Sequence, residues 1–204
     1  MTSKVRMNET DYAKVHIMSF LAIAILSINL CGFLFDLIFL DLIFPSNRNW
    51  REHFLKLPVF LQKLSVFIIV GPVFIAPLIP QNRFNISDFI SLPIGIFLFV
   101  LGWILIIFAF FKIGVIPAVR KKSNLITTGV YRVVRHPIYS GTLISVLGWT
   151  ILLKSIISIV YFPFLFLWYF LGTFVEERIL IEQYGDQYLD YKKKVTKRFI
   201  PFIV

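Results

Sequence analysis

Long apolar stretches separated by short polar segments dominate the hydrophobic pattern of this chain. They run roughly over residues 17–40, 58–78, 89–111 and 138–175. A bilayer core needs about 20 apolar residues per helical span, so each of the first three stretches predicts one membrane helix. Pro72 and Pro77 fall inside the second stretch and predict a kink there.

The fourth stretch, residues 138–175, is too long for a single crossing. At a rise of 1.5 Å per residue its helix would be about 57 Å long, whereas a bilayer core is about 30 Å thick. Lys154 and Ser155 interrupt its middle and predict the turn of a helical hairpin. The pattern therefore predicts an all-α polytopic membrane helical bundle of about five transmembrane helices. We expect three N-terminal spans in residues 1–111 and a C-terminal core in 112–204.

The segment from Glu176 to Val204 is amphipathic. Its apolar and aromatic residues recur at spacings of three and four, which is typical of a surface helix: Ile179, Leu180, Tyr184, Tyr188 and Tyr191. Gly185 weakens this pattern mildly, and Pro201 predicts the end of the helix. We expect a cytoplasmic tail helix whose tyrosines form an interfacial aromatic belt.

Composition and charge support a membrane protein. Hydrophobic residues make up 58% of the 204 positions, and the mean hydropathy of +0.81 lies outside the range of soluble domains. The net charge of +10 predicts anionic headgroups rather than nucleic acid as the partner, because most basic residues border apolar segments. A lone cysteine, Cys31, and three scattered histidines predict neither a disulfide framework nor a metal site.

The basic residues also predict the orientation. If the five spans alternate, 16 Lys and Arg residues fall on one side of the membrane and 5 on the other. The side with more basic residues holds the C-terminus, so the positive-inside rule places the C-terminus in the cytoplasm.

Two polar clusters lie at the ends of the predicted hairpin. Arg135 and His136 precede it, and Glu176 and Glu177 follow it about 40 residues later. An antiparallel hairpin returns both ends to one membrane face, so we expect these side chains to lie close together. A cation, an imidazole, carboxylates and nearby phenols at the lipid boundary suit a charged cofactor that meets an apolar substrate. The chain carries no P-loop, Rossmann fingerprint or nucleophile elbow that would indicate other chemistry.

Three ordered motifs then resemble a known family: GVYRVVRHPIYSG, EERILIEQYGDQYLDY and KRFIP. Together they span about Leu125 to Pro201 and resemble the isoprenylcysteine carboxyl methyltransferase and phospholipid methyltransferase family of integral membrane methyltransferases. The first 110 residues match only in hydropathy. The resemblance implies an S-adenosylmethionine-dependent methyltransferase of class EC 2.1.1 whose C-terminal helices hold the cofactor and release S-adenosylhomocysteine.

The resemblance also implies the site residues. It indicates that the following residues bind the cofactor or order its pocket: Tyr131, Arg135, His136, Pro137, Tyr139, and Glu176 or Glu177. We expect only one of the two adjacent glutamates to face the site. Many relatives carry Gly-His-x-Leu before this region, whereas the present chain reads Lys-Ser-Asn-Leu there. Either Asn124, next to Leu125, replaces the histidine as a hydrogen-bonding group, or the loop binds the cofactor differently.

Methyl transfer from a sulfonium needs alignment and exclusion of water rather than a protein nucleophile. For a carboxylate acceptor, Arg135 could hold the anion in a bidentate contact, and we therefore assign catalytic roles to Arg135 and Glu177. An amine or thiol acceptor would instead need a base. We expect a hydrophobic or prenylated acceptor that arrives from the bilayer. The compartment would be the plasma membrane in a prokaryote and the endoplasmic reticulum in a eukaryote.

Alternative functions are open at this level. A phospholipid amine N-methyltransferase would share the cofactor pocket, a sterol reductase ends in a similar tyrosine pattern, and a membrane scaffold would use the polar clusters as anchors only. An interfacial arginine is more often a headgroup anchor than a functional residue. Asp36, inside the first apolar stretch, is a further candidate for an intramembrane acid.

Overall fold

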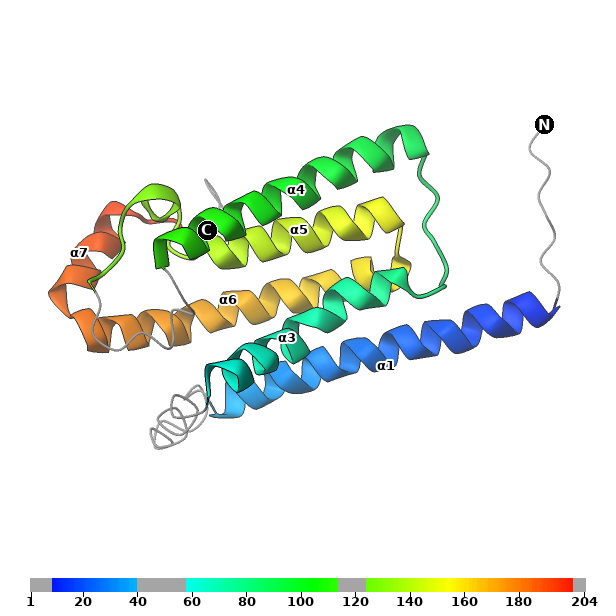
Figure 1. Ribbon diagram of the computed structural model, residues 1–204, viewed down its shortest axis with the longest axis horizontal. Coiled ribbons are helices and arrows are strands. Elements are labelled where there is room, and N and C mark those ends of the chain that lie inside the picture. The colour runs from blue at the N-terminus through cyan, green and yellow to red at the C-terminus, as the bar shows by residue number, and fades with distance from the viewer. Residues whose placement is uncertain (1–8, 40–57, 114–123, 200–204) are drawn as a thin grey trace.

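The computed structural model describes residues 9–39, 58–113 and 124–199, and every regular element in these ranges is a helix (Figure 1). The one strand-like pairing there is an isolated bridge between Arg83 and Ser155. Five helices run along the long axis of the molecule, and a short helix lies at one end (Figure 1). The predicted all-α bundle is confirmed.

The N-terminal helices are α1 (Glu9–Phe39) and α3 (Val59–Ile75), which pack against each other. Pro72 lies inside α3 without ending it, and the chain tightens into the 3-10 helix η1 (Ala76–Leu78), which contains Pro77. Membrane helices tolerate such prolines because neighbouring groups satisfy the freed backbone. The backbone of Asp36 belongs to α1, but its side chain lies outside what the structure describes, so its role stays a prediction.

The tightest helix pair is α4 (Asp88–Ile113) with α5 (Pro137–Leu153). Small residues line the contact on both helices: Gly95, Gly102, Ala109, Gly141, Ser145 and Gly148. A methyl group built on Gly102 would lie 2.5 Å from the Gly141 carbonyl oxygen, and one on Gly141 would lie 2.6 Å from the Gly102 oxygen. Small residues permit this backbone approach, as is typical of membrane helix pairs.

The predicted hairpin turn is confirmed at Lys154 and Ser155. Lys154 adopts a left-handed conformation (φ 55°) at the end of α5, and Ser155 caps α6 (Ile156–Tyr184) through a 3.1 Å bond from the Ser158 amide. Lys154 Nζ also lies 2.5 Å from Asp88 Oδ1 at the start of α4. This ion pair therefore fixes the hairpin turn to the start of α4.

Gln81 ties the same end of the bundle together and is 6% exposed. Its Nε2 donates to the Ala76 carbonyl at 2.7 Å, and its Oε1 accepts from Ser155 Oγ at 2.7 Å. We expect Gln81→Leu to lower the free energy of unfolding by about 1–3 kcal/mol, because it strands buried partners. Thermal unfolding in detergent checks this, with the exposed Gln187→Leu as the matched control. Equal unfolding temperatures for the two variants would contradict the assignment.

The C-terminal region differs from the predicted continuous tail helix. Helix α6 runs without interruption from the apolar stretch through Glu176 to Tyr184 and ends at Gly185, whose φ of +56° is accessible mainly to glycine. A separate helix α7 (Asp186–Lys194) follows. Residues 195–199 then leave the helix, so it ends well before Pro201, which lies outside the described residues. Gly185 thus ends one helix and separates it from the next, rather than mildly weakening a continuous helix.

The aromatic-belt interpretation is wrong for two of the tail tyrosines. Tyr188 and Tyr191 are 1% and 6% exposed, and they pack with Val195 beneath α7. Leu125 and Tyr184 border this cluster. The amphipathic pattern was a sign of burial against protein rather than of contact with headgroups.

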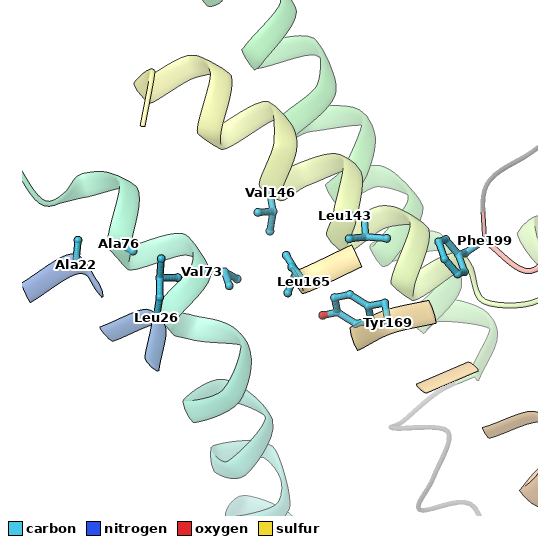
Figure 2. Packing of buried hydrophobic residues seen from close by; sticks show 9 residues of the cluster. All are labelled: Ala22, Leu26, Val73, Ala76, Leu143, Val146, Leu165, Tyr169 and Phe199. Atoms are coloured by element: carbon cyan, nitrogen blue, oxygen red, sulfur yellow. The ribbon is translucent and has the colours of Figure 1, made fainter. Parts of the chain in front are cut away.

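A central apolar cluster links helices that are distant in sequence (Figure 2). It joins residues of α1, α3, η1, α5 and α6 with one residue of the C-terminal segment: Ala22, Leu26, Val73, Ala76, Leu143, Val146, Leu165, Tyr169 and Phe199. The last of these shows that the segment after α7 returns to the bundle.

Three helices in the described ranges are long and apolar enough to cross a membrane: Tyr12–Gly32, Asp88–Ile113 and Ile156–Tyr184. Helix α5 is apolar but has 17 residues, about 26 Å at 1.5 Å per residue. The chain is an integral membrane protein, and the count of five spans stays a prediction.

Candidate functional site

The two ends of the hairpin meet as the sequence predicted. Arg135 donates from Nε and Nη2 to Glu177 Oε1, at 2.9 and 2.7 Å. His136 Nδ1 lies 3.0 Å from Glu176 Oε2. Both adjacent glutamates therefore contact the cluster, which corrects the expectation that only one would. They do so because their partners, Arg135 and His136, are also adjacent in sequence and directly precede α5.

Arg135 is 7% exposed, and its guanidinium is engaged on several sides. Besides Glu177, it donates from Nη1 to the Val195 carbonyl oxygen at 2.6 Å. Its three nitrogens thus hold α6 and the segment after α7. The geometry favours a role in fixing Glu177, and direct contact of Arg135 with a substrate stays a prediction.

Glu177 is the centre of the charge network. Its side chain is 4% exposed, and Oε2 accepts from Lys192 Nζ at 2.8 Å. Oε1 also lies 3.4 Å from Arg198 Nε and 3.5 Å from His136 Nε2. The sequence did not reveal Lys192 as a partner of Glu177, because it belongs to a run of basic residues and such a run is typical of a solvated face. Within this network, cationic side chains outnumber carboxylates.

His136 lies between the two glutamates and an aromatic row. Its imidazole stacks on Tyr139 with ring centres 5.4 Å apart, and Tyr139 lies 4.8 Å from Tyr169 of α6. Burial lowers the pKa of His136, but the carboxylates of Glu176 and Glu177 outweigh that effect, so the net shift is upward. The imidazole is thus held in its charged form toward neutral pH.

This shift predicts a pH dependence of stability. Because the pKa of His136 is raised in the folded protein above its ordinary value of 6.5, its stabilisation is complete below that pH. It is lost as the pH rises through the folded-state pKa. We expect the unfolding temperature of wild type to exceed that of His136→Asn most at pH 6 and least at pH 9. His16→Asn, at an exposed position in α1, is the control. A pH-independent difference would contradict this view.

Two phenols border the cluster without hydrogen-bond partners for their hydroxyls among the described residues. They belong to Tyr131, in the 3-10 helix η3 (Gly129–Arg132), and to Tyr188 of α7. Tyr191 Oη anchors this region by donating to the Tyr131 carbonyl oxygen at 2.7 Å. Burial, followed by the nearby glutamate charges, raises the pKa of both unpartnered hydroxyls. Both therefore stay protonated and able to donate.

The remaining predicted site residues occupy supporting positions. Pro137 is buried at the first position of α5, where its missing amide proton costs nothing. Leu125 packs against the Tyr188 cluster, and Asn124 beside it is exposed. Among the described contacts, none joins Asn124 to His136 or Glu176, so its cofactor role stays a prediction. No group of three metal-ligating side chains occurs in the described residues.

Comparison with known proteins finds similarity over the middle and C-terminal part of the chain. Residues 90–187 match the family model for phospholipid methyltransferase, and this range contains most of α4, all of α5 and α6, and both glutamates. The first motif of the resemblance lies inside this range, and the second begins in it and extends to Tyr191.

Curated relatives are similar over less than half of the chain. A protein-S-isoprenylcysteine O-methyltransferase of Schizosaccharomyces pombe is 39% identical over 92 residues, which cover 44% of this chain and 38% of the relative. A probable protein of the same name from Oryza sativa subsp. indica is 42% identical over 84 residues, 40% of this chain and 43% of the relative. The protein-S-isoprenylcysteine O-methyltransferase of Mus musculus is 41% identical over 83 residues, 39% and 28% respectively. The aligned segments thus span less than half of each relative.

Proposed function

Because residues 90–187 match the family model for phospholipid methyltransferase, we propose that this chain is a membrane methyltransferase that uses S-adenosylmethionine. The acceptor would be a carboxylate on a lipid-like or prenylated molecule. The observation that carries the proposal is the buried pairing of Arg135 and His136 with Glu177 and Glu176 at the two ends of one hairpin. Anchoring alone would require no such pairing, which argues against a scaffold.

The residues at the hairpin ends fit the proposed cofactor. The hydroxyls of Tyr131 and Tyr188 are buried without a hydrogen-bond partner among the described residues. Buried polar groups are nearly always satisfied, so such atoms point to a polar ligand. The ribose hydroxyls and the amino-acid end of S-adenosylmethionine offer suitable partners. Glu176, with its side chain 27% exposed, is the carboxylate best placed to meet an ammonium group.

When bound, S-adenosylmethionine supplies a methyl group on a sulfonium, which an acceptor oxygen can take by in-line displacement. The protein then needs no nucleophile of its own. His136 and Tyr139 would form one wall of the pocket, since their stacked rings are fixed by Glu176 and Tyr169. Arg135 and Glu177 would hold the backbone of this wall in place rather than react.

The charge balance supports a carboxylate acceptor over an amine. With His136 protonated, the ion-pair network holds four cations (Arg135, His136, Lys192 and Arg198) against the carboxylates of Glu176 and Glu177. An excess of positive charge attracts a carboxylate and repels an ammonium. A carboxylate also needs no base, whereas a phospholipid amine must lose a proton. The names of the curated relatives agree with this choice, and the amine N-methyltransferase is the alternative.

The proposed location of the reaction rests on the division of the chain and on its basic residues. Residues 112–204 would form the methyltransferase core, with residues 1–111 as supporting spans. The excess of basic residues on the C-terminal side supports an active site that faces the cytoplasm. The membrane would be the plasma membrane in a prokaryote and the endoplasmic reticulum in a eukaryote.

An acceptor assay tests the proposal. Purified protein in lipid nanodiscs is given S-adenosylmethionine with a labelled methyl group, and either an S-prenylcysteine with a free carboxylate or phosphatidylethanolamine. A methyl ester releases labelled methanol in base, whereas a methylated amine does not. We expect base-labile label with the prenylcysteine. Base-stable label with phosphatidylethanolamine would favour the alternative, and no label with either would contradict the carboxylate proposal.

A further inference from the structure

Residues 195–199, which we name the C-terminal strap, run alongside the start of α5. The amide of Arg135 donates to the Lys197 carbonyl at 3.0 Å, and the amide of His136 donates to the Arg198 carbonyl at 2.7 Å. Ser140 Oγ donates to the carbonyl of Phe199. The strap therefore satisfies the backbone amides of the two residues that directly precede α5, as well as one side-chain hydroxyl in its first turn.

Phe199 anchors the strap in the bundle. Its side chain is 1% exposed and belongs to the central apolar cluster (Figure 2). Its ring meets Phe166 edge-on at 5.4 Å between centres, and Phe170 at 6.4 Å. Burial of a phenylalanine ring stabilises the folded state about as much as burial of any other large core side chain. The strap is therefore a fixed part of the fold.

Arg198 connects the strap to Glu177. Its guanidinium carbon lies 3.9 Å from the ring centre of Phe174, and its Nε lies 3.4 Å from Glu177 Oε1. Phe174 and Glu177 are three residues apart on α6, so they lie on one face of that helix. The Phe174 ring packs against the face of the Arg198 guanidinium, and the Glu177 carboxylate lies at the edge of that guanidinium.

From these contacts we propose that Arg198 is a positioning residue for the site: it holds the Glu177 carboxylate against Arg135 and His136. The inference rests on the proposed function and extends the site to a segment beyond the matched residues 90–187. Without Arg198, Glu177 Oε1 keeps the bonds from Arg135, but the carboxylate loses one of the contacts that oppose its rotation toward Lys192 on Oε2. That movement would release Arg135 and His136 from their present arrangement.

Three variants separate positioning from charge. Arg198→Gln removes the charge and keeps much of the length, and Arg198→Lys restores the charge and a cation over Phe174. Lys197→Gln is the matched control, because it loses an adjacent charge while the Lys197 backbone contact to Arg135 remains. Each full-length protein is purified in detergent. The measurements are the dissociation constant of S-adenosylhomocysteine and the hydrogen exchange of the Arg135 and His136 amides without ligand.

We expect Arg198→Gln to weaken binding at least tenfold and to speed exchange of both amides, while Arg198→Lys recovers most of the affinity. Lys197→Gln should bind within twofold of wild type. Equal affinity and exchange in Arg198→Gln and Lys197→Gln would overturn the inference. If wild type binds no S-adenosylhomocysteine, the proposed function fails. The exchange measurement then still decides whether Arg198 holds the strap and the start of α5 together.

Discussion

Replacing Glu177 with alanine is expected to abolish cofactor binding and to cost about 3–5 kcal/mol of stability. Glu177 is 3% exposed and is the carboxylate that Arg135, Lys192 and Arg198 share. Its removal leaves the buried Arg135 guanidinium without its carboxylate partner, and an unpaired buried charge is strongly destabilising. The measurements are thermal unfolding in detergent and titration with S-adenosylhomocysteine.

A matched change separates this effect from a general loss of negative charge. Asp190 pairs with Lys193 on α7, with side chains 63% and 78% exposed, so Asp190→Ala should leave both stability and binding nearly unchanged. A second variant, Glu177→Gln, keeps the shape and some hydrogen bonds and should be intermediate. A Glu177→Ala protein that unfolds at the wild-type temperature and binds normally would show that the charge network is not needed.

Substituting Gly102 is expected to have the second large effect, through packing rather than charge. Gly102→Ala places a methyl group 2.5 Å from the Gly141 carbonyl oxygen, where only backbone movement can make room. Overpacking of this kind costs about 1–3 kcal/mol, and Gly102→Leu should prevent folding. Because α5 carries the start of the site, separation of α4 from α5 should also weaken ligand binding. Thermal unfolding of the series Gly, Ala and Leu at position 102 checks this.

Gly172 is the control for that series. A methyl group on Gly172 of α6 would meet the Tyr139 hydroxyl at 3.9 Å, an ordinary contact. Gly172→Ala should therefore be neutral or slightly stabilising, since alanine favours helix. If Gly102→Ala and Gly172→Ala unfold at the same temperature, close approach of α4 and α5 is not what holds the bundle together.

The hairpin and the pairing at its ends could be predicted because they follow from long-range geometry that hydropathy reveals. An apolar stretch twice the thickness of a bilayer core must turn back, and Lys154 with Ser155 marks the place. The return of the chain then brings Glu176 and Glu177 to Arg135 and His136 without any knowledge of side-chain packing.

The C-terminal region could not be predicted in the same way because its periodicity has two physical meanings. Tyr188 and Tyr191 recur at helical spacing whether the apolar face meets lipid headgroups or other protein. The structure buries them under Leu125 and Tyr184, and the break at Gly185 directs α7 back toward the site. Pattern alone gave Gly185 too little weight, since glycine inside a helical pattern is often tolerated.

The contacts of Lys192 on α7 and of Arg198 in the strap were likewise beyond sequence reasoning. Lys192 and Arg198 stand among surface-type lysines, and charge runs are usually solvated. Their role depends on one buried acceptor, Glu177. They can reach it only because the chain changes direction after α6. The motif KRFIP was the available signal, because the resemblance already included it.

Equilibrium binding of S-adenosylhomocysteine to the purified protein tests the central claim, that the ends of the hairpin form the cofactor site. The comparison is wild type against Glu176→Gln, which keeps the side-chain shape but removes the charge next to His136. We expect saturable micromolar binding by wild type that the substitution weakens at least tenfold, about 1.4 kcal/mol. Folded wild-type protein that shows no saturable binding, or a Glu176→Gln variant that binds as tightly, would contradict the account.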